Sequence, residues 1–301
     1  MMKKLMIAAV AAAAAFAYAD EVKEDAKPAS ELTKESSWTD AFSFYANTGV
    51  YSGYQLYGSL VNSEPTIQGY AEVAARLSVD EFDLGKLAVG CWFNNDLTGK
   101  RADHHGSVRR AFNEFDPQFS WSRNFWFDDE QQYGIFYKTS FVWYYYPHPS
   151  SSRKVDTTMD WNHYFEFVNP FVTPYINVVH EYHESDANLL QFGLKKAVGV
   201  GDSLTLTPTL EFVWRNRNYG WCFPNYGYNA KGEKMNSCLA TMRVGSDLSY
   251  RIADNVALFA KLYYCSIIDD DMRDAADYAS GNAYGKYKDF AWGGIGIEIF
   301  F

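Results

Sequence analysis

From Trp38 onward, apolar and polar side chains alternate in segments of roughly ten residues, the length of a membrane-barrel strand. The alternation is clearest between residues 204 and 215. Even positions there are apolar: Leu204, Leu206, Pro208, Leu210, Phe212 and Trp214. Odd positions are mostly polar: Thr205, Thr207, Thr209, Glu211, Val213 and Arg215. Because a strand points successive side chains to opposite faces, each segment has one apolar and one polar face. The pattern predicts an all-β protein, either a soluble sandwich or a barrel with its oily face in lipid.

The chain accommodates twelve such strands. They are expected at 42–54, 65–78, 85–94, 112–123, 132–145, 157–168, 171–183, 188–198, 203–215, 238–251, 254–266 and 288–301. The connections at 79–84, 124–131, 169–170, 199–202 and 252–253 are short, and most of the other six are longer. Short periplasmic turns that alternate with longer outer loops are typical of a transmembrane antiparallel up-and-down barrel. The even strand count places both ends of the barrel sequence in the periplasm. The connection at 184–187 is the one that fits this alternation poorly, because it is short where a longer outer loop is expected.

The first nineteen residues have the three parts of a secretory signal peptide. Lys3 and Lys4 precede an apolar run, which ends at the small-x-small sequence from Ala17 to Ala19. We therefore expect export and cleavage after Ala19, with residues 20–37 as a charged periplasmic lead and residues 38–301 as one barrel in the bacterial outer membrane. The net charge of −10 disfavours nucleic acid as a partner.

Aromatic residues make up 18% of the chain, which a barrel uses as belts at its two membrane interfaces. The outer belt is expected from Trp143, Tyr144, Tyr145, Tyr146, Trp161, Tyr182, Trp214, Tyr219 and Trp221. The inner belt is expected from Phe82, Phe125, Trp126, Phe127 and Phe301. Outer-membrane lipid and lipopolysaccharide are thus the expected surroundings.

The last strand ends on an aromatic residue. Phe301, Ile299 and Ile297 share one face of the segment. Such an ending resembles the signal that the barrel-assembly machinery recognises in outer-membrane proteins, and these three residues are the predicted assembly signal. An edge strand of a soluble sheet is the alternative, which the signal peptide disfavours.

Residues 47–73 carry a set of short motifs: a glycine, a Ser-x-Tyr strand end, a loop glycine and a Pro-x-x-Gln-Gly strand start. The matching residues are Gly49, Ser52, Tyr54, Gly58, Pro65, Gln68 and Gly69. Further motifs follow at Gly90-Cys91-Trp92, Asn113-Glu114-Phe115-Asp116 and Tyr145-Tyr146-Pro147. Their order resembles the TorF-like family of outer-membrane porins and fades after about residue 200. The chain departs from the family at Gly53, where Asp is usual, and at Tyr57, where Arg is usual.

The alternation also predicts which charges face inward. The acids are Glu72, Glu114, Asp116, Asp160, Glu166, Glu181, Glu211, Asp247 and Glu298, and the bases are Arg76, Lys138, Lys195, Arg215, Arg243 and Lys261. The pore-lining candidates are Glu72, Arg76, Lys138, Glu166, Lys195, Glu211, Arg243, Asp247, Lys261 and Glu298. Two interpretations compete: a hydrated lumen that prefers cations, or charges that pair across the lumen and plug it. The width of a twelve-strand barrel permits either.

The cysteines, the clustered aspartates and the histidines are better explained by structural roles. Cys222 and Cys238 bracket one loop and could form a disulfide in an oxidising compartment, although spacing does not fix connectivity. Five aspartates between Asp269 and Asp277 could bind calcium, but a solvated acidic loop is favoured. His104 and His105 are expected in a solvated loop. No Gly-x-Ser-x-Gly motif occurs, and His163 lacks a serine partner in the sequence, so an enzyme is disfavoured.

These features together predict a porin-like channel for passive diffusion of small hydrophilic solutes, with no cofactor and no metal. The alternative is a non-conducting barrel that acts in adhesion or envelope integrity through its outer loops. Neither the solute nor the oligomeric state follows from the sequence.

Overall fold

A computed structural model describes residues 41–79, 82–97, 114–146, 157–220, 222–279 and 285–301. The barrel strands are β1 (Phe42–Tyr51), β4 (Thr66–Val79), β5 (Phe82–Asp96), β6 (Glu114–Trp126), β7 (Gly134–Tyr145), β8 (Thr157–Val168), β9 (Thr173–Glu181), β10 (Ala187–Lys195), β12 (Leu204–Arg215), β13 (Cys238–Ala253), β14 (Val256–Ile267) and β15 (Asp289–Phe300). Shorter elements are β2 (Tyr54–Leu56), β3 (Ser59–Asn62), β11 (Val198–Val200), η2 (Pro224–Gly227) and α2 (Asp270–Tyr278). The expected signal peptide, its cleavage site, the periplasmic lead and the His104–His105 loop lie outside the described residues.

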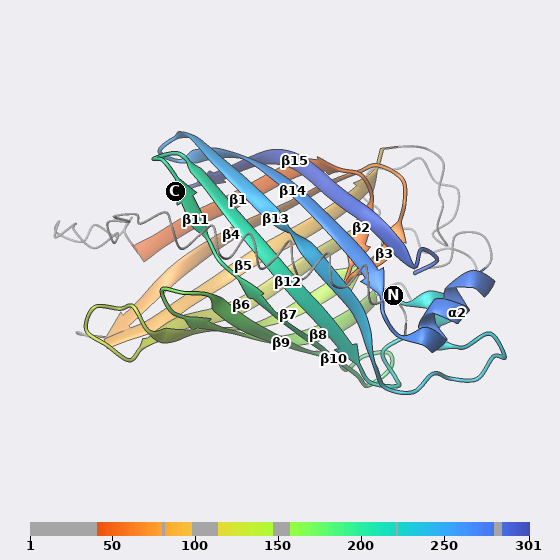
Figure 1. The fold of residues 1–301 in the computed structure, drawn as a ribbon. Helices are drawn as coiled ribbons and strands as arrows, with labels where there is room; N and C mark the ends of the chain where they lie inside the picture. Colours follow the sequence, from red (N-terminus) through yellow and green to blue (C-terminus); the bar gives the residue numbers. More distant parts are fainter. Residues whose placement is uncertain (1–40, 80–81, 98–113, 147–156, 221, 280–284) are drawn as a thin grey trace.

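The sheet closes on itself as an antiparallel barrel (Figure 1). Successive barrel strands pair around the ring, and β1 pairs with β15 from Tyr45↔Phe300 to Tyr51↔Gly294. β10 pairs with β12, and the short β11 extends that seam. The predicted twelve-stranded barrel is therefore confirmed. Strand ends differ by a few residues, most visibly where the expected strand 188–198 divides into β10 and β11.

The outward face is apolar, as the alternation predicts. Exposed residues of this face include Val50, Val73, Val89, Phe119, Phe141, Leu262 and Ile295. A water-soluble protein would bury so continuous a set of aliphatic and aromatic side chains, whereas lipid accommodates it. Among the described residues, no helix is long and apolar enough to cross a membrane.

Three tyrosines depart from the expected outer belt. Trp143, Tyr145 and Trp161 are exposed, but Tyr144, Tyr146 and Tyr219 are at most 6% exposed. Tyr144 follows Trp143 in β7, so the two side chains point to opposite faces. Tyr219 lies after β12, and its ring packs edge to face on that of Tyr57 with centroids 5.8 Å apart. These tyrosines therefore belong to the interior and not to the belt.

The β2–β3 hairpin packs inside one opening of the barrel, which is called the outer end below. Residues 59–62 of β3 are all buried, and Leu60 packs in a cluster with wall residues such as Phe259 and Trp292. The turn is tight because Tyr57 and Gly58 both have positive φ, 50° and 74°. The expected connection 55–64 is thus a folded element.

The segment with five aspartates is a helix and not a loop. Asp269 caps α2 by accepting a hydrogen bond from the backbone N–H of Met272, and Asp270 and Asp271 lie in the first turn. Acids at these positions stabilise a helix N-terminus. Met272, Ala275 and Ala276 are buried against the loop that follows β12. Figure 1 shows α2 at the same end of the barrel as β2 and β3.

Candidate functional site

A belt of five acids lines the lumen, and each accepts a hydrogen bond from an inward tyrosine. The luminal belt comprises Glu72, Glu166, Glu211, Asp247 and Glu298 with Tyr70, Tyr164, Tyr175, Tyr263 and Tyr45. The Tyr175 hydroxyl donates to Glu211 at 2.8 Å, and that of Tyr263 donates to Asp247 at 2.6 Å. The belt therefore offers carboxylates together with aromatic faces.

Four of these acids also pair with a predicted pore-lining base. The pairs are Glu72–Lys138 (3.4 Å), Glu211–Arg243 (3.0 Å), Asp247–Lys261 (3.2 Å) and Glu166–Lys195. Glu298 instead accepts hydrogen bonds from Tyr45 and Ser249. Among the described residues it forms no ion pair with a base, so the belt carries one excess negative charge.

The four ion pairs differ in how far they reach around the barrel. Glu211–Arg243 and Asp247–Lys261 join neighbouring strands in direct register. Glu166–Lys195 joins β8 to β10, and Glu72–Lys138 joins β4 to β7. None of these four pairs links opposite sides of the ring, although Glu72–Lys138 reaches over two intervening strands, and the plugged lumen stays a competing hypothesis.

Luminal rings lie flat against the wall because glycines face them. Gly245 is the register partner of Tyr263, and Gly193 is that of Tyr175. A Cβ at Gly245 would come within 2.6 Å of the Tyr263 ring, and one at Gly193 within 2.8 Å of the Tyr175 hydroxyl. Glycine thus keeps these tyrosines beside the acids that they bind and away from the lumen axis.

The β2–β3 hairpin crosses the lumen at the outer end. Tyr54 donates to Glu114 of β6 at 3.1 Å, and Tyr57 donates to Asp160 of β8 at 3.5 Å. On the other side, Thr241 of β13 donates to the Tyr57 carbonyl oxygen at 2.7 Å. Trp292 of β15 donates to the Gly53 carbonyl oxygen at 2.8 Å. Since β6 faces β13 and β8 faces β15 in the ring order, the hairpin spans the opening.

The wall beneath the hairpin is acidic. Glu114, Asp116, Asp160 and Glu181 are all buried, at most 4% exposed. Asp116 lies close enough to Glu114 and Asp160 for their charges to interact. The Glu181 carboxylate is held by Thr158, Ser185 and the backbone N–H groups of residues 183–185. Arg215, also predicted to face inward, is fully buried and donates to the carbonyl oxygens of Asn216 and Tyr219.

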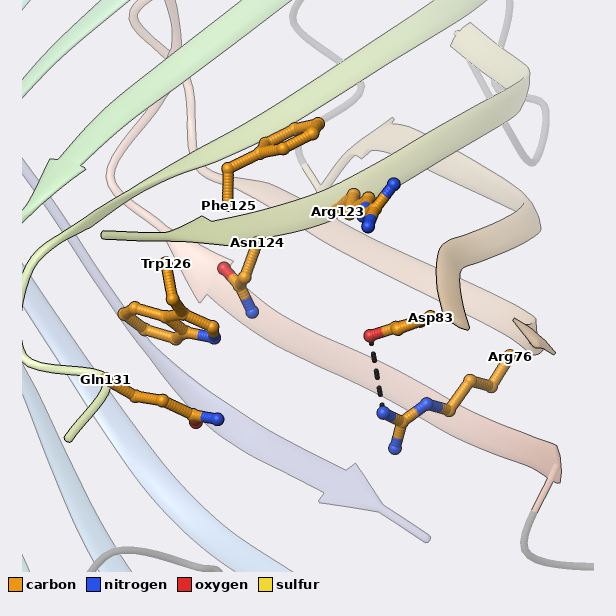
Figure 2. A pocket seen from close by; sticks show the side chains of 7 residues that line it. All are labelled: Arg76, Asp83, Arg123, Asn124, Phe125, Trp126 and Gln131. Carbon is orange, nitrogen blue, oxygen red and sulfur yellow. Dashed lines mark hydrogen bonds and ion pairs between the residues drawn. The ribbon is translucent and has the colours of Figure 1, made fainter. Parts of the chain in front are cut away.

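Arg76 lies at the opposite, inner end of the barrel and pairs with Asp83 at 3.3 Å. A cavity of about 520 Å³ there is lined by Arg76, Asp83, Arg123, Asn124, Phe125, Trp126 and Gln131 (Figure 2). Figure 2 shows Asn124 and Trp126 on the same side of β6 as this ion pair. Arg76 is therefore separated from the luminal belt and lies at the mouth.

The predicted disulfide is not formed in the structure. The four cysteines, Cys91, Cys222, Cys238 and Cys265, are all free. Cys222 is buried in the loop core, whereas Cys238 begins β13 and its sulfur lies 3.5 Å from that of Met272. The Cys238 side chain therefore packs against Met272 of α2.

The three residues of the predicted assembly signal lie at the β1–β15 seam. Ile297 and Ile299 are on the outward face beside Ile295. Phe301 is 71% exposed, and its backbone exchanges two hydrogen bonds with Phe44. The lipid-facing His163 stacks on Tyr137 and hydrogen-bonds its hydroxyl at 2.8 Å.

Sequence reasoning located the luminal charges but missed the hairpin and the tyrosines around Asp160. The alternation of β7 carried a signal for Tyr144, because Lys138 and Ser140 share its face. The hairpin gave no such signal, since its two strands have only three and four residues.

Comparison with known proteins finds no matching family model and no matching curated protein. Solved structures are similar in fold at low identity. The KdgM porin is 8% identical (TM-score 0.43), with 85% of this chain and 98% of that chain covered. An outer membrane channel from Pseudomonas putida F1 is 9% identical (TM-score 0.48), with 92% and 100% covered. The outer membrane phospholipase A from Escherichia coli is 10% identical (TM-score 0.42), with 86% and 95% covered. These likenesses concern the fold alone.

Proposed function

We propose that this chain is a porin-like channel of the bacterial outer membrane, of the TorF-like type, through which small hydrophilic solutes diffuse passively. The arrangement of the luminal ion pairs carries this proposal, because none of the four pairs among the described residues joins opposite sides of the ring. Outer-membrane lipid and lipopolysaccharide would surround the barrel, and the barrel-assembly machinery would insert it after cleavage at Ala19.

A preference for cations follows from the charge balance. Glu298 gives the belt one excess negative charge, because it forms no ion pair with a base among the described residues. Negative potential in a narrow, low-dielectric passage raises the local concentration of cations. We therefore expect K⁺ to permeate more readily than Cl⁻.

The rival function is a non-conducting barrel that acts through its outer loops. The hairpin favours this alternative, because its hydrogen bonds to opposite walls narrow the opening. The channel requires a hydrated path past the hairpin, whereas the rival requires a closed one.

Planar-bilayer recording on the refolded mature chain separates the two functions. The channel predicts discrete conductance steps. Under a KCl gradient it also predicts a reversal potential whose sign shows that K⁺ permeates more readily than Cl⁻. A matched recording with Glu298→Gln should move that potential toward zero. Absence of conductance steps from protein that shows the heat-dependent gel shift of a folded barrel would contradict the channel.

A further inference from the structure

We propose that Arg123 binds the phosphate group of a membrane phospholipid on the outward surface of the barrel, near its inner end. The acyl chains of that lipid lie on an aromatic strip beside Arg123, which comprises Trp121, Tyr137 and Phe165 of three neighbouring strands. The site rests on the proposed placement of the barrel in the outer membrane and is independent of conduction.

Arg123 lies on the outward face of β6. It shares that face with Phe119 and Phe125, which are 49% and 39% exposed. Figure 2 shows Phe125 on the side of β6 away from Asn124 and Trp126, which line the cavity at the inner mouth. The Arg123 guanidinium lies over the Phe125 ring, 5.0 Å from its centroid, in a cation–π contact. Arg123 therefore places a positive charge outside the barrel wall.

No acid among the described residues neutralises this charge. The Arg123 guanidinium forms no ion pair or hydrogen bond with any of them, and its Nε atom is buried without an acceptor. Acids close by have other partners. Asp83 pairs with Arg76 and accepts from the backbone N–H of Gly85, while Asp128 accepts from the backbone N–H groups of residues 132 and 133. An anion from outside the chain is therefore the partner that Arg123 lacks.

The direction of the Arg123 side chain fits an anion at the level of the lipid headgroups. Phe125 is two residues nearer the inner end of β6 than Arg123 is, and β6 ends at Trp126. Since the guanidinium lies over Phe125, the side chain extends toward that end. A charge that faces lipid is costly at the bilayer midplane and is tolerated near the interface, which long basic side chains reach in this way.

The aromatic strip begins level with Arg123 and continues toward the middle of the barrel. Tyr137 is the register partner of Arg123, and Phe165 is that of Tyr137. The ring of Tyr137 lies 4.7 Å from that of Phe165 and 5.8 Å from that of Trp121. The Trp121 indole N–H donates to the Leu84 carbonyl oxygen at 2.9 Å, which fixes the ring against the wall. The polar groups of the strip thus bind protein atoms, and its apolar surface remains for acyl chains.

Charge and apolar surface are arranged in the order that a phospholipid requires. A phosphate matches the planar guanidinium, which can donate two parallel hydrogen bonds to its oxygens. Acyl chains attached to that phosphate extend toward the middle of the bilayer, where Trp121 lies. Free inorganic phosphate would use only Arg123 and leave the aromatic strip uncovered, so the lipid uses the surface more completely.

Native mass spectrometry of the refolded mature barrel in detergent tests the site, with dioleoylphosphatidylglycerol and dioleoylglycerol as probes. The second probe has the same acyl chains but no phosphate. The wild type should bind the phospholipid more tightly. Arg123→Gln should weaken phospholipid binding at least about threefold, as expected for an exposed ion pair, and leave dioleoylglycerol binding unchanged.

Lys86→Gln is the matched control. Lys86 is an exposed base that shares the inward face of β5 with Trp92, and its register partner Ser122 directly precedes Arg123. The variant therefore removes the same charge at nearly the same level but on the luminal side, and it should bind both probes as the wild type does. Trp121→Ala should weaken both probes, because it removes part of the aromatic strip.

The comparison of the two probes on the wild type needs no variant, so the test does not depend on the folding of Arg123→Gln. Equal affinity of the wild type for both probes would overturn the site, as would an Arg123→Gln barrel that binds the phospholipid like the wild type. Displacement of the phospholipid by inorganic phosphate at constant ionic strength would overturn the lipid as occupant. Bilayer recording on the same preparations keeps the proposals apart: conductance without phosphate-dependent lipid binding refutes only the lipid site, and such binding without conductance refutes only the channel.

Discussion

At the residue scale, burial controls the chemistry of the outer-end thiols. Cys222 is fully buried beside Tyr219 and Phe223 in the loop core. Burial raises the pKa of the Cys222 thiol well above its usual value, because desolvation disfavours the thiolate. The thiolate is the form that reacts with alkylating agents.

Cys222 should therefore resist iodoacetamide at pH 8 in the folded barrel and react after the barrel is unfolded by heat in detergent. Peptide mass spectrometry of labelled protein, before and after heating, measures both states. A Cys222→Ser variant provides the blank for the assigned peptide. Rapid labelling of Cys222 in the folded state would show that the loop core is open.

At the element scale, one glycine allows the hairpin to dock. Gly58 has a φ of +74°, and a Cβ there would lie 2.4 Å from Thr241 Oγ1, the atom that holds the Tyr57 carbonyl. Gly58→Ala should therefore displace the tip from β13, on top of the roughly 1 kcal/mol that a left-handed alanine costs. If the barrel is a channel, its single-channel conductance should rise.

Gly232→Ala is the matched control for that experiment. Gly232 has a similar φ of +78°, and no atom lies within 4 Å of the position that the alanine methyl group would take. It therefore shares the backbone strain of Gly58 but not the clash. If both variants change conductance alike, or neither changes it, the docked hairpin does not narrow the passage.

The elements differ in how far the sequence predicts them, for physical reasons. Barrel strands are predictable because lipid requires an unbroken apolar face, which imposes a period of two along each strand. The hairpin is stabilised by distant wall residues such as Trp292 and Thr241, and no pattern in the hairpin's own sequence indicates those contacts. α2 has the acidic start of a helix, yet its mean hydropathy is low and only its contact with the outer loop buries it.

The residues of the candidate site also differ in how far the sequence predicts them. Alternation places Glu211 and Arg243 in the lumen, and their pairing follows from strand register. The three tyrosines that hydrogen-bond Asp160 come from the hairpin, a wall strand and the loop after β12, which are far apart in sequence. Such a site depends on tertiary packing and cannot be predicted from any one segment.

At the scale of the whole molecule, closure of the barrel depends on the seam between its first and last strands. β1 pairs with β15 over seven register positions from Tyr45 to Tyr51. Beyond them, Phe44 and Phe301 exchange backbone hydrogen bonds of 3.0 and 2.9 Å, and their rings lie 6.1 Å apart. An unpaired strand edge in lipid is costly, so the seam must close fully.

Deletion of Phe301 should therefore lower the yield of assembled barrel in the outer membrane, because it removes both seam hydrogen bonds and the predicted assembly signal. Phe301→Ala keeps the backbone bonds and removes only the ring. The heat-dependent gel shift of membrane fractions measures assembly, and refolding in detergent without the assembly machinery measures intrinsic closure. If Phe301 acts as a signal, Phe301→Ala should impair assembly in cells and refold normally in detergent. Normal assembly of both variants in cells would contradict the role assigned to Phe301.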